Sequence, residues 1–118
     1  MKISLLSTSA GTGDYLDDEN FEEVDIYDPV PSSADFGVHL NGDSMEPQFQ
    51  DGELVWFTKM EELESGDLGL FYLNGKTYFK KFIVNKNGNF LVSLNAKYAP
   101  IPILEYDTFK IFAKLATD

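Results

Sequence analysis

The chain of 118 residues is long enough to form one domain with its own hydrophobic core. The chain has 20 Asp and Glu and 9 Lys and Arg, so its formal charge is −11. A chain with this charge is excluded as a strong binder of nucleic-acid phosphates. The absence of Cys excludes disulfides, thiolate metal sites and Cys nucleophiles, and a single histidine, His39, excludes a zinc site with several His ligands.

The N-terminal part of the chain is acidic. Residues 14–28 read DYLDDENFEEVDIYD, with eight carboxylates and no basic residue, and a segment rich in Pro and Ser follows at 29–33. Such a charge run is typical of a solvated linker. We therefore expect residues 1–35 to form an N-terminal segment and acidic linker, and residues 36–118 to form the folded domain.

The remainder of the chain alternates short apolar runs with turn residues, which is typical of all-β domains. Asn74 and Gly75 separate two of these runs, and both accept the positive φ angles of a type I′ hairpin turn. Helical character is confined to one expected turn at 60–66. The strand-like runs, about six in number, are residues 37–40, 54–57, 68–73, 76–84, 90–94 and 109–115.

Several short strands have edges that must be paired or covered. We therefore expect a mainly β fold, built as a small, curved antiparallel sheet or a partly closed barrel.

Ser44 is a candidate nucleophile in the turn-rich segment Leu40-Asn41-Gly42-Asp43-Ser44-Met45-Glu46-Pro47. Gly42 allows a tight backbone path that could expose the hydroxyl and nearby N–H groups to a cleft, as an oxyanion site requires. A Ser beside Gly and Asp is also common as an ordinary turn residue that bonds the backbone. The segment alone leaves both interpretations open.

Lys80 and Lys81 interrupt an apolar strand-like run. Strand alternation sends them to opposite faces, so one of them is expected to point inward. One interpretation is an edge strand protected from aggregation by charge. The other is a buried, deprotonated lysine that acts as a base, since burial can lower a lysine pKa by about 3 to 5 units. A Ser-Lys pair needs no histidine, which suits this composition.

The ordered motifs of the chain resemble the LexA/UmuD/phage CI-repressor family of self-cleaving serine peptidases. The resemblance covers roughly residues 36–115, and the ordered set is more specific than any single motif. The residues that carry it are Gly42-Asp43-Ser44-Met45-Glu46-Pro47, Asp51-Gly52-Glu53-Leu54-Val55, Gly66-Asp67, Tyr78-Phe79-Lys80-Lys81-Phe82, and Leu94-Asn95 through Tyr98-Ala99-Pro100-Ile101.

The resemblance implies a LexA-type C-terminal domain with a Ser-Lys dyad and no cofactor or metal. In the family pattern Ser44 is the nucleophile and Lys80 the general base, whereas spacing alone could not choose between Lys80 and Lys81. Backbone N–H groups near Ser44 and Met45 are expected to bind the oxyanion. The family's scissile bond, Ala-Gly or a near relative, corresponds to Ala10-Gly11.

The resemblance also implies a biological setting. We expect the self-cleavage and dimerisation domain of a cytoplasmic, phage-type or LexA-like repressor of the SOS response, with a RecA filament as cleavage stimulator. Operator DNA is expected to be bound only through a missing N-terminal domain. The acidic linker does not decide between a repressor fragment and a shorter UmuD-type protein, and we expect the repressor fragment. The alternative is a catalytically silent dimerisation or partner-sensing module. A leader-peptide protease is disfavoured because no apolar run reaches the roughly 20 residues of a membrane span.

The other conspicuous side chains are assigned no chemistry. His39 matches no family role and is expected to be packed or exposed at the surface. Asp51 and Glu53 match the family's turn before a strand. Large aromatic side chains are most often buried, so we expect core positions for Trp56, Phe57 and Phe71.

Overall fold

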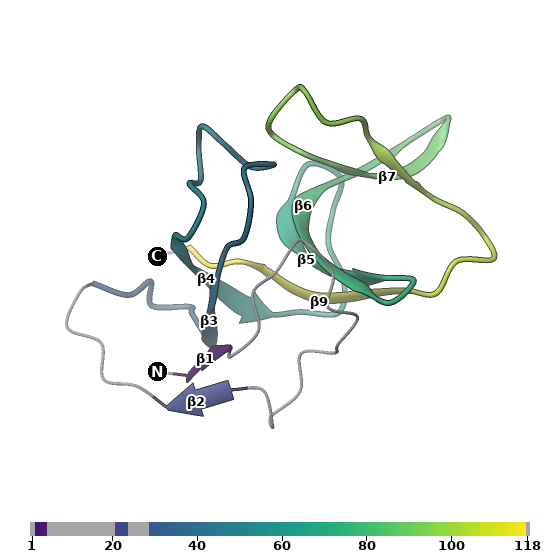
Figure 1. Cartoon of the computed structure of the whole chain (residues 1–118). Coiled ribbons are helices and arrows are strands. Elements are labelled where there is room, and N and C mark those ends of the chain that lie inside the picture. Colours follow the sequence, from purple (N-terminus) through teal and green to yellow (C-terminus); the bar gives the residue numbers. More distant parts are fainter. Residues whose placement is uncertain (1, 5–20, 24–28, 118) are drawn as a thin grey trace.

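The computed structural model describes residues 2–4, 21–23 and 29–117 of the chain. These residues form nine strands and no helix, in one sheet of order β2-β1-β3-β4-β9-β5-β6-β7-β8 (Figure 1). Neighbouring strands are antiparallel except for β1 and β3, which are parallel. The strands are β1 (Lys2–Ser4), β2 (Phe21–Glu23), β3 (Phe36–His39), β4 (Leu54–Lys59), β5 (Leu68–Leu73), β6 (Lys76–Asn85), β7 (Gly88–Val92), β8 (Ile101–Ile103) and β9 (Phe109–Leu115).

The expected fold class is confirmed, with an antiparallel sheet as the main element. The sheet is not closed, because β2 and β8 each have a single neighbour. The expected number of strands was too low: β1, β2 and β8 were missed, and each has only three residues. The helical turn expected at 60–66 is wrong, and the chain instead turns at Glu64, whose N–H donates to Asp67 Oδ2 at 2.9 Å.

The Asn74-Gly75 hairpin between β5 and β6 is confirmed. Both residues have positive φ angles, 48° and 93°, as a type I′ turn requires. The Asn74 side chain also donates to Asp107 Oδ1 at 2.8 Å and accepts from the Thr108 N–H at 2.9 Å. These bonds connect the hairpin to the turn before β9. The bond from the Asn74 side chain, together with one from the Leu104 N–H, lowers the pKa of the Asp107 carboxyl.

Strand β5 contributes to two hydrophobic clusters. Leu70 packs in one with β3, β4 and β6, and Phe71 packs in the other with β6, β7 and β9; both are fully buried. Successive residues of a strand point to opposite faces. Both faces of β5 are therefore covered, which explains why residues 68–73 are almost continuously apolar.

The first cluster brings β6 close to the segment that joins β3 and β4. Phe79 on β6 is 1% exposed, and its ring meets Phe57 edge-on at 5.2 Å and Phe49 at 5.0 Å between centroids. Phe57 belongs to β4, whereas Phe49 belongs to the joining segment. The predictions of core positions for Phe57 and Phe71 are confirmed, and Trp56 is partly buried. The packing of Phe79 holds the next residue, Lys80, beside this segment.

The packing predicts a difference between two glycines that lie within strands. A Cβ on Gly69 would lie 2.5 Å from the carbonyl oxygen of Ala113 on β9, which cannot move without breaking the sheet, whereas a Cβ on Gly37 would meet the Trp56 and Leu54 side chains. We expect Gly69→Ala to lower the free energy of unfolding by about 1 to 3 kcal/mol, and Gly37→Ala to lower it by less. Urea unfolding of both variants measures this, and an equal or larger loss for Gly37→Ala would contradict it.

Candidate active site

Ser44 lies in the segment between β3 and β4, which is closed at its base by backbone bonds. The Leu40 N–H donates to Glu53 O at 2.9 Å, and the Gly52 N–H donates back to Leu40 O at 3.0 Å. Gly42 has a φ of 103°, a conformation that side-chain-bearing residues rarely adopt. Its N–H donates to Asp51 Oδ1 at 2.8 Å. Asp51 is therefore a structural residue that shapes the turn before Ser44.

Met45 anchors the segment between β3 and β4, which carries Ser44, in the hydrophobic core. Its side chain is 3% exposed and packs in the first cluster, and its sulfur accepts from the Leu94 N–H at 3.5 Å. Burial of this side chain fixes the backbone directly after Ser44. The serine itself is half-buried, so its hydroxyl stands at the edge of the core.

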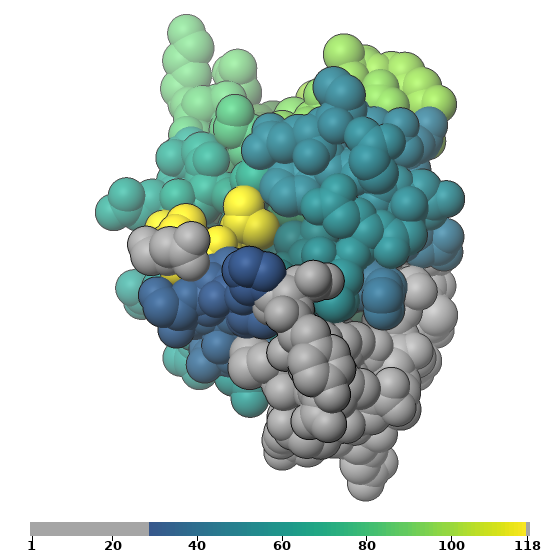
Figure 2. Space-filling model, turned by 90° about the vertical axis from the view of Figure 1, so that its left-hand side faces the viewer, coloured from purple at the N-terminus to yellow at the C-terminus, as the bar shows by residue number. Residues whose placement is uncertain are grey.

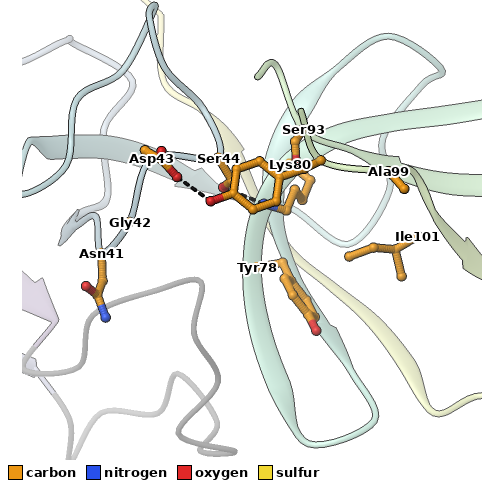
Figure 3. Close-up of a pocket in the computed structure, with 10 residues that line it drawn as sticks. Asn41, Gly42, Asp43, Ser44, Tyr78, Lys80, Ser93, Ala99 and Ile101 are labelled. Carbon is orange, nitrogen blue, oxygen red and sulfur yellow. Dashed lines mark hydrogen bonds between the residues drawn. The ribbon is translucent and has the colours of Figure 1, made fainter. Parts of the chain in front are cut away.

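Lys80 is the lysine of the pair that points inward. It is 4% exposed, whereas Lys81 is half-buried. Lys80 Nζ lies 2.6 Å from Ser44 Oγ, to which it donates a hydrogen bond, and 5.9 Å from the centroid of the Tyr78 ring. Two residues that are far apart in sequence are thus in direct contact (Figure 3).

Burial changes the protonation of Lys80. Removing the ammonium from water lowers the pKa of Lys80 from 10.5 to about 8. At pH 7 a lysine with a pKa of about 8 is neutral in roughly one molecule in ten, against roughly one in 3,000 for an ordinary lysine. When the amine is neutral, the Ser44 hydroxyl can become the donor across the same 2.6 Å contact, and Lys80 Nζ can accept its proton.

Ser44 and Lys80 open into a pocket of about 410 Å³, which is within the size range of ligand sites. Apolar groups of Tyr78, Ala99 and Ile101 form part of its wall, and Figure 3 shows Ser93 beside Lys80. Ser93 is buried at 9% exposure. The residues that line the pocket are Asn41, Gly42, Asp43, Ser44, Tyr78, Lys80, Ser93, Tyr98, Ala99 and Ile101.

The segment between β7 and β8 directly contacts the segment that carries Ser44. The Asn95 N–H donates to Ser44 O at 2.9 Å, and Asn95 Nδ2 donates to Asp43 O at 3.0 Å. Figure 2 shows the two segments in contact on one face, the segment of Ser44 in blue-teal and the segment between β7 and β8 in light green. These bonds fix the peptide groups on both sides of Ser44.

The backbone around Ser44 offers N–H groups for an oxyanion. Within the described residues, the N–H groups of Ser44 and Met45 donate no hydrogen bond, whereas the Glu46 N–H donates to Asp43 O at 3.1 Å. Donors that are not engaged elsewhere are available to a developing negative charge. This is the position at which the sequence predicts the oxyanion donors.

Among the described residues, His39 does not line the pocket. His39 is exposed at the end of β3, with Nδ1 3.4 Å from Gly52 O. Ala10 and Gly11 lie outside the described residues, as does most of the acidic run. In the part of the chain that the structure describes, no three His, Cys, Asp or Glu side chains are grouped to hold a metal ion. The described residues also contain no helix long and apolar enough to cross a membrane.

Sequence reasoning assigned no role to several residues of the site. Tyr78 and Ser93 line the pocket, and Asn95, Lys97 and Tyr98 bond to the residues around Ser44. The last three were part of a family motif, but their side chains carry no pattern that indicates contact with Ser44. A close approach between distant loops leaves no periodic signal in the sequence.

Two comparisons with known proteins show the family to which the chain belongs. The sequence model of the family described as Peptidase S24-like matches residues 3–116. The LexA repressor of Carboxydothermus hydrogenoformans is 35% identical over 121 aligned positions, which cover 98% of this chain and 58% of that repressor. The chain thus spans less than two thirds of the length of this curated relative. Because the family match extends over nearly all of the sequence, the chain belongs to the Peptidase S24-like family, to which LexA-like repressors are related.

Proposed function

We propose that the chain is the self-cleavage and dimerisation domain of a phage-type or LexA-like repressor, and that it hydrolyses its own Ala10-Gly11 bond. The observation that carries this proposal is the 2.6 Å contact between Ser44 Oγ and the buried Nζ of Lys80. A hydroxyl paired with a desolvated amine is an activated nucleophile. Membership of a peptidase family supports the same interpretation.

The reaction follows from the two side chains. Neutral Lys80 accepts the proton of Ser44 as its Oγ attacks the carbonyl carbon of Ala10, and the N–H groups of Ser44 and Met45 bind the oxyanion. The Ala10-Gly11 bond then breaks, and Lys80 gives its proton to the amine of Gly11. Water next attacks the ester on Ser44, again losing a proton to Lys80, which returns that proton to Ser44 Oγ and releases the carboxylate of Ala10.

The pairing of β1 supports cleavage within one chain. Because β1 is parallel to β3, with Ile3 opposite Gly37, the C-terminal ends of both strands lie at the same end of the sheet. Residues 5–20, which contain Ala10-Gly11, follow β1 there, and the segment of Ser44 follows β3. We assign residues 1–35 to the cleavage-site segment and linker, of which β1 and β2 add to the edge of the sheet, and residues 36–118 to the peptidase domain.

The wider biology is part of the proposal. Pairing of two copies, operator binding through residues outside this sequence, and stimulation of cleavage by a RecA filament are what a LexA-like function requires. The charge of −11 disfavours DNA binding by these 118 residues themselves. A silent dimerisation module would need no buried lysine, so the 4% exposure of Lys80 favours the peptidase over this alternative.

The dyad predicts which substitutions stop cleavage. We expect Ser44→Ala and Lys80→Ala to abolish it, because each removes one partner of the 2.6 Å contact, whereas Lys81→Ala retains it. The measurement is intact mass during incubation at pH 9, where the parent releases a fragment that begins at Gly11. Cleavage in Lys80→Ala at the parent's rate would assign the base elsewhere, and no fragment from the parent would favour the silent module.

The lowered pKa of Lys80 predicts how the rate depends on pH. The cleavage rate of the parent should rise from pH 6 and level off above pH 9, with a midpoint near 8, because only the neutral amine accepts the hydroxyl proton. Following fragment formation in steps of half a pH unit gives this profile. A rate that is flat between pH 6 and 10 would contradict a lysine base.

The same burial predicts a pH-dependent stability. Below about pH 8, Lys80 is protonated in both the folded and the unfolded protein, and burial of its charge destabilises the folded state. Between pH 8 and 10.5 the lysine is neutral in the folded protein and still protonated in the unfolded protein, so this destabilisation is removed as the pH rises. The unfolding free energy of the parent should therefore rise over this range by up to about 3 kcal/mol relative to Lys80→Met. Urea unfolding of both proteins, each carrying Ser44→Ala to prevent cleavage, measures the difference. A difference that does not vary with pH would show that Lys80 is solvated.

A further inference from the structure

The side chain directly before the nucleophile is held by two residues from another part of the chain. Asp43 Oδ2 accepts a hydrogen bond from Lys97 Nζ at 2.6 Å, and Asp43 Oδ1 accepts one from the Tyr98 hydroxyl. Both carboxylate oxygens are therefore engaged. With the two Asn95 bonds to the backbone of Asp43 and Ser44, the 95–98 turn holds the Asp43-Ser44 unit by four contacts.

The turn that supplies these contacts is itself ordered by internal bonds. The Lys97 N–H donates to Asn95 Oδ1 at 3.1 Å, and the Tyr98 N–H donates to Asn95 O at 3.2 Å. Lys97 Nζ also lies 5.3 Å from the centroid of the Tyr98 ring. These contacts hold the Lys97 and Tyr98 side chains next to each other, on the same side of the turn as Asp43.

The cluster of Asp43, Lys97 and Tyr98 is exposed to solvent, so its contribution to stability differs from its effect on the geometry of the site. The side chains of Lys97 and Asp43 are 60% and 37% exposed, and ion pairs in such positions contribute little to folding. The position of a reacting group matters more, because a displacement of about 1 Å can lower the reaction rate by about two orders of magnitude. The contacts are well placed to orient Ser44, although they add little to stability.

The cluster also keeps its charges in the pH range where Lys80 titrates. The hydrogen bonds to Lys97 and Tyr98 lower the pKa of Asp43, and the bond to Asp43 raises the pKa of both partners, with a further contribution from the Glu46 carboxylate. Lys97 therefore stays protonated at a pH at which Lys80, whose pKa is lowered to about 8, loses its proton.

We propose that Lys97 and Tyr98 are positioning residues of the protease, which act through Asp43 to hold Ser44 Oγ against Lys80 Nζ. This inference rests on the proposed function of the Ser44-Lys80 pair. Lys97 is not among the described residues that line the pocket, so its influence on Ser44 passes through Asp43. Tyr98 does line the pocket, and its hydroxyl is the part that contacts Asp43.

The test compares Tyr98→Phe and Lys97→Gln with matched controls. Tyr98→Phe keeps the ring in the pocket wall and removes only the hydroxyl. Tyr106→Phe is its control, since Tyr106 is 84% exposed, and Lys86→Gln, at an exposed position in the turn after β6, is the control for Lys97. Lys97→Arg is the conservative variant, because it keeps the charge and the donor.

Three quantities are measured for each protein. The first is the self-cleavage rate from pH 6 to 10, and the second is the midpoint of urea unfolding. The third is the reaction of Ser44 with a fluorophosphonate, in which the serine oxygen bonds to phosphorus, fluoride leaves and the hydroxyl proton passes to Lys80. This reaction, followed by intact mass, reports on Ser44 without requiring the Ala10-Gly11 segment to enter the pocket.

We expect Tyr98→Phe and Lys97→Gln to lower the limiting alkaline cleavage rate and the fluorophosphonate rate on the order of tenfold. The midpoint of the pH profile should stay near 8, and the urea midpoint should not change. The two controls and Lys97→Arg should resemble the parent.

Two results would overturn the inference while the proposed function survives. One is an active parent whose rates are unaffected by either substitution, and the other is a loss of rate that accompanies a shifted pH midpoint or a lowered urea midpoint, which would indicate a general structural role. A parent that neither cleaves nor reacts with the fluorophosphonate, with Ser44→Ala indistinguishable from it, would overturn the proposed function and this inference together.

Discussion

The arrangement of the site depends on a lysine that is buried without a carboxylate partner. Lys80 is 4% exposed, and no described acidic residue forms an ion pair with it. Its hydrogen-bond partner is the uncharged Ser44 hydroxyl. A carboxylate in the place of this hydroxyl would stabilise the ammonium and keep the lysine protonated, whereas the uncharged hydroxyl leaves the desolvation cost uncompensated, and burial lowers the pKa of Lys80 to about 8. The one carboxylate that lines the pocket, that of Asp43, is bonded to Lys97 and Tyr98 and forms no ion pair with Lys80.

The fold holds Ser44 against this lysine from two sides. On the inner side Met45 is buried in the first hydrophobic cluster, to which Phe79 of β6 also belongs. One core therefore positions both the segment of Ser44 and the strand of Lys80. On the outer side Asn95 and its neighbours bond to Asp43 and Ser44. The two lysines near Ser44 illustrate opposite effects of environment on pKa. Burial lowers that of Lys80, and an adjacent carboxylate raises that of Lys97.

Most of the strands were predictable because their signals are local. The bounds of β5 and β9 agree with the expected ranges, and the turn at Asn74-Gly75 has the expected φ angles. Strand β8 was missed because it has three residues, including Pro102, and gains its strand conformation from pairing with β7. The contacts of Asn95, Lys97 and Tyr98 were missed for a related reason. They join segments about 50 residues apart in the sequence, and no local sequence pattern predicts that these segments are close in space.

The sequence by itself determined the fold class, through apolar alternation and turn residues, and it limited the available chemistry to hydroxyls, amines and carboxylates, since the chain has no Cys and one His. Its motifs also selected Ser44 and Lys80 as candidates, although the spacing of residues left Lys80 and Lys81 equivalent. Only the tertiary structure decided which lysine is buried, how close it lies to Ser44 and which residues hold them together. The physical reason is that burial, pKa and hydrogen bonding depend on neighbours in space, and those of Ser44 come from β6 and from the segment before β8.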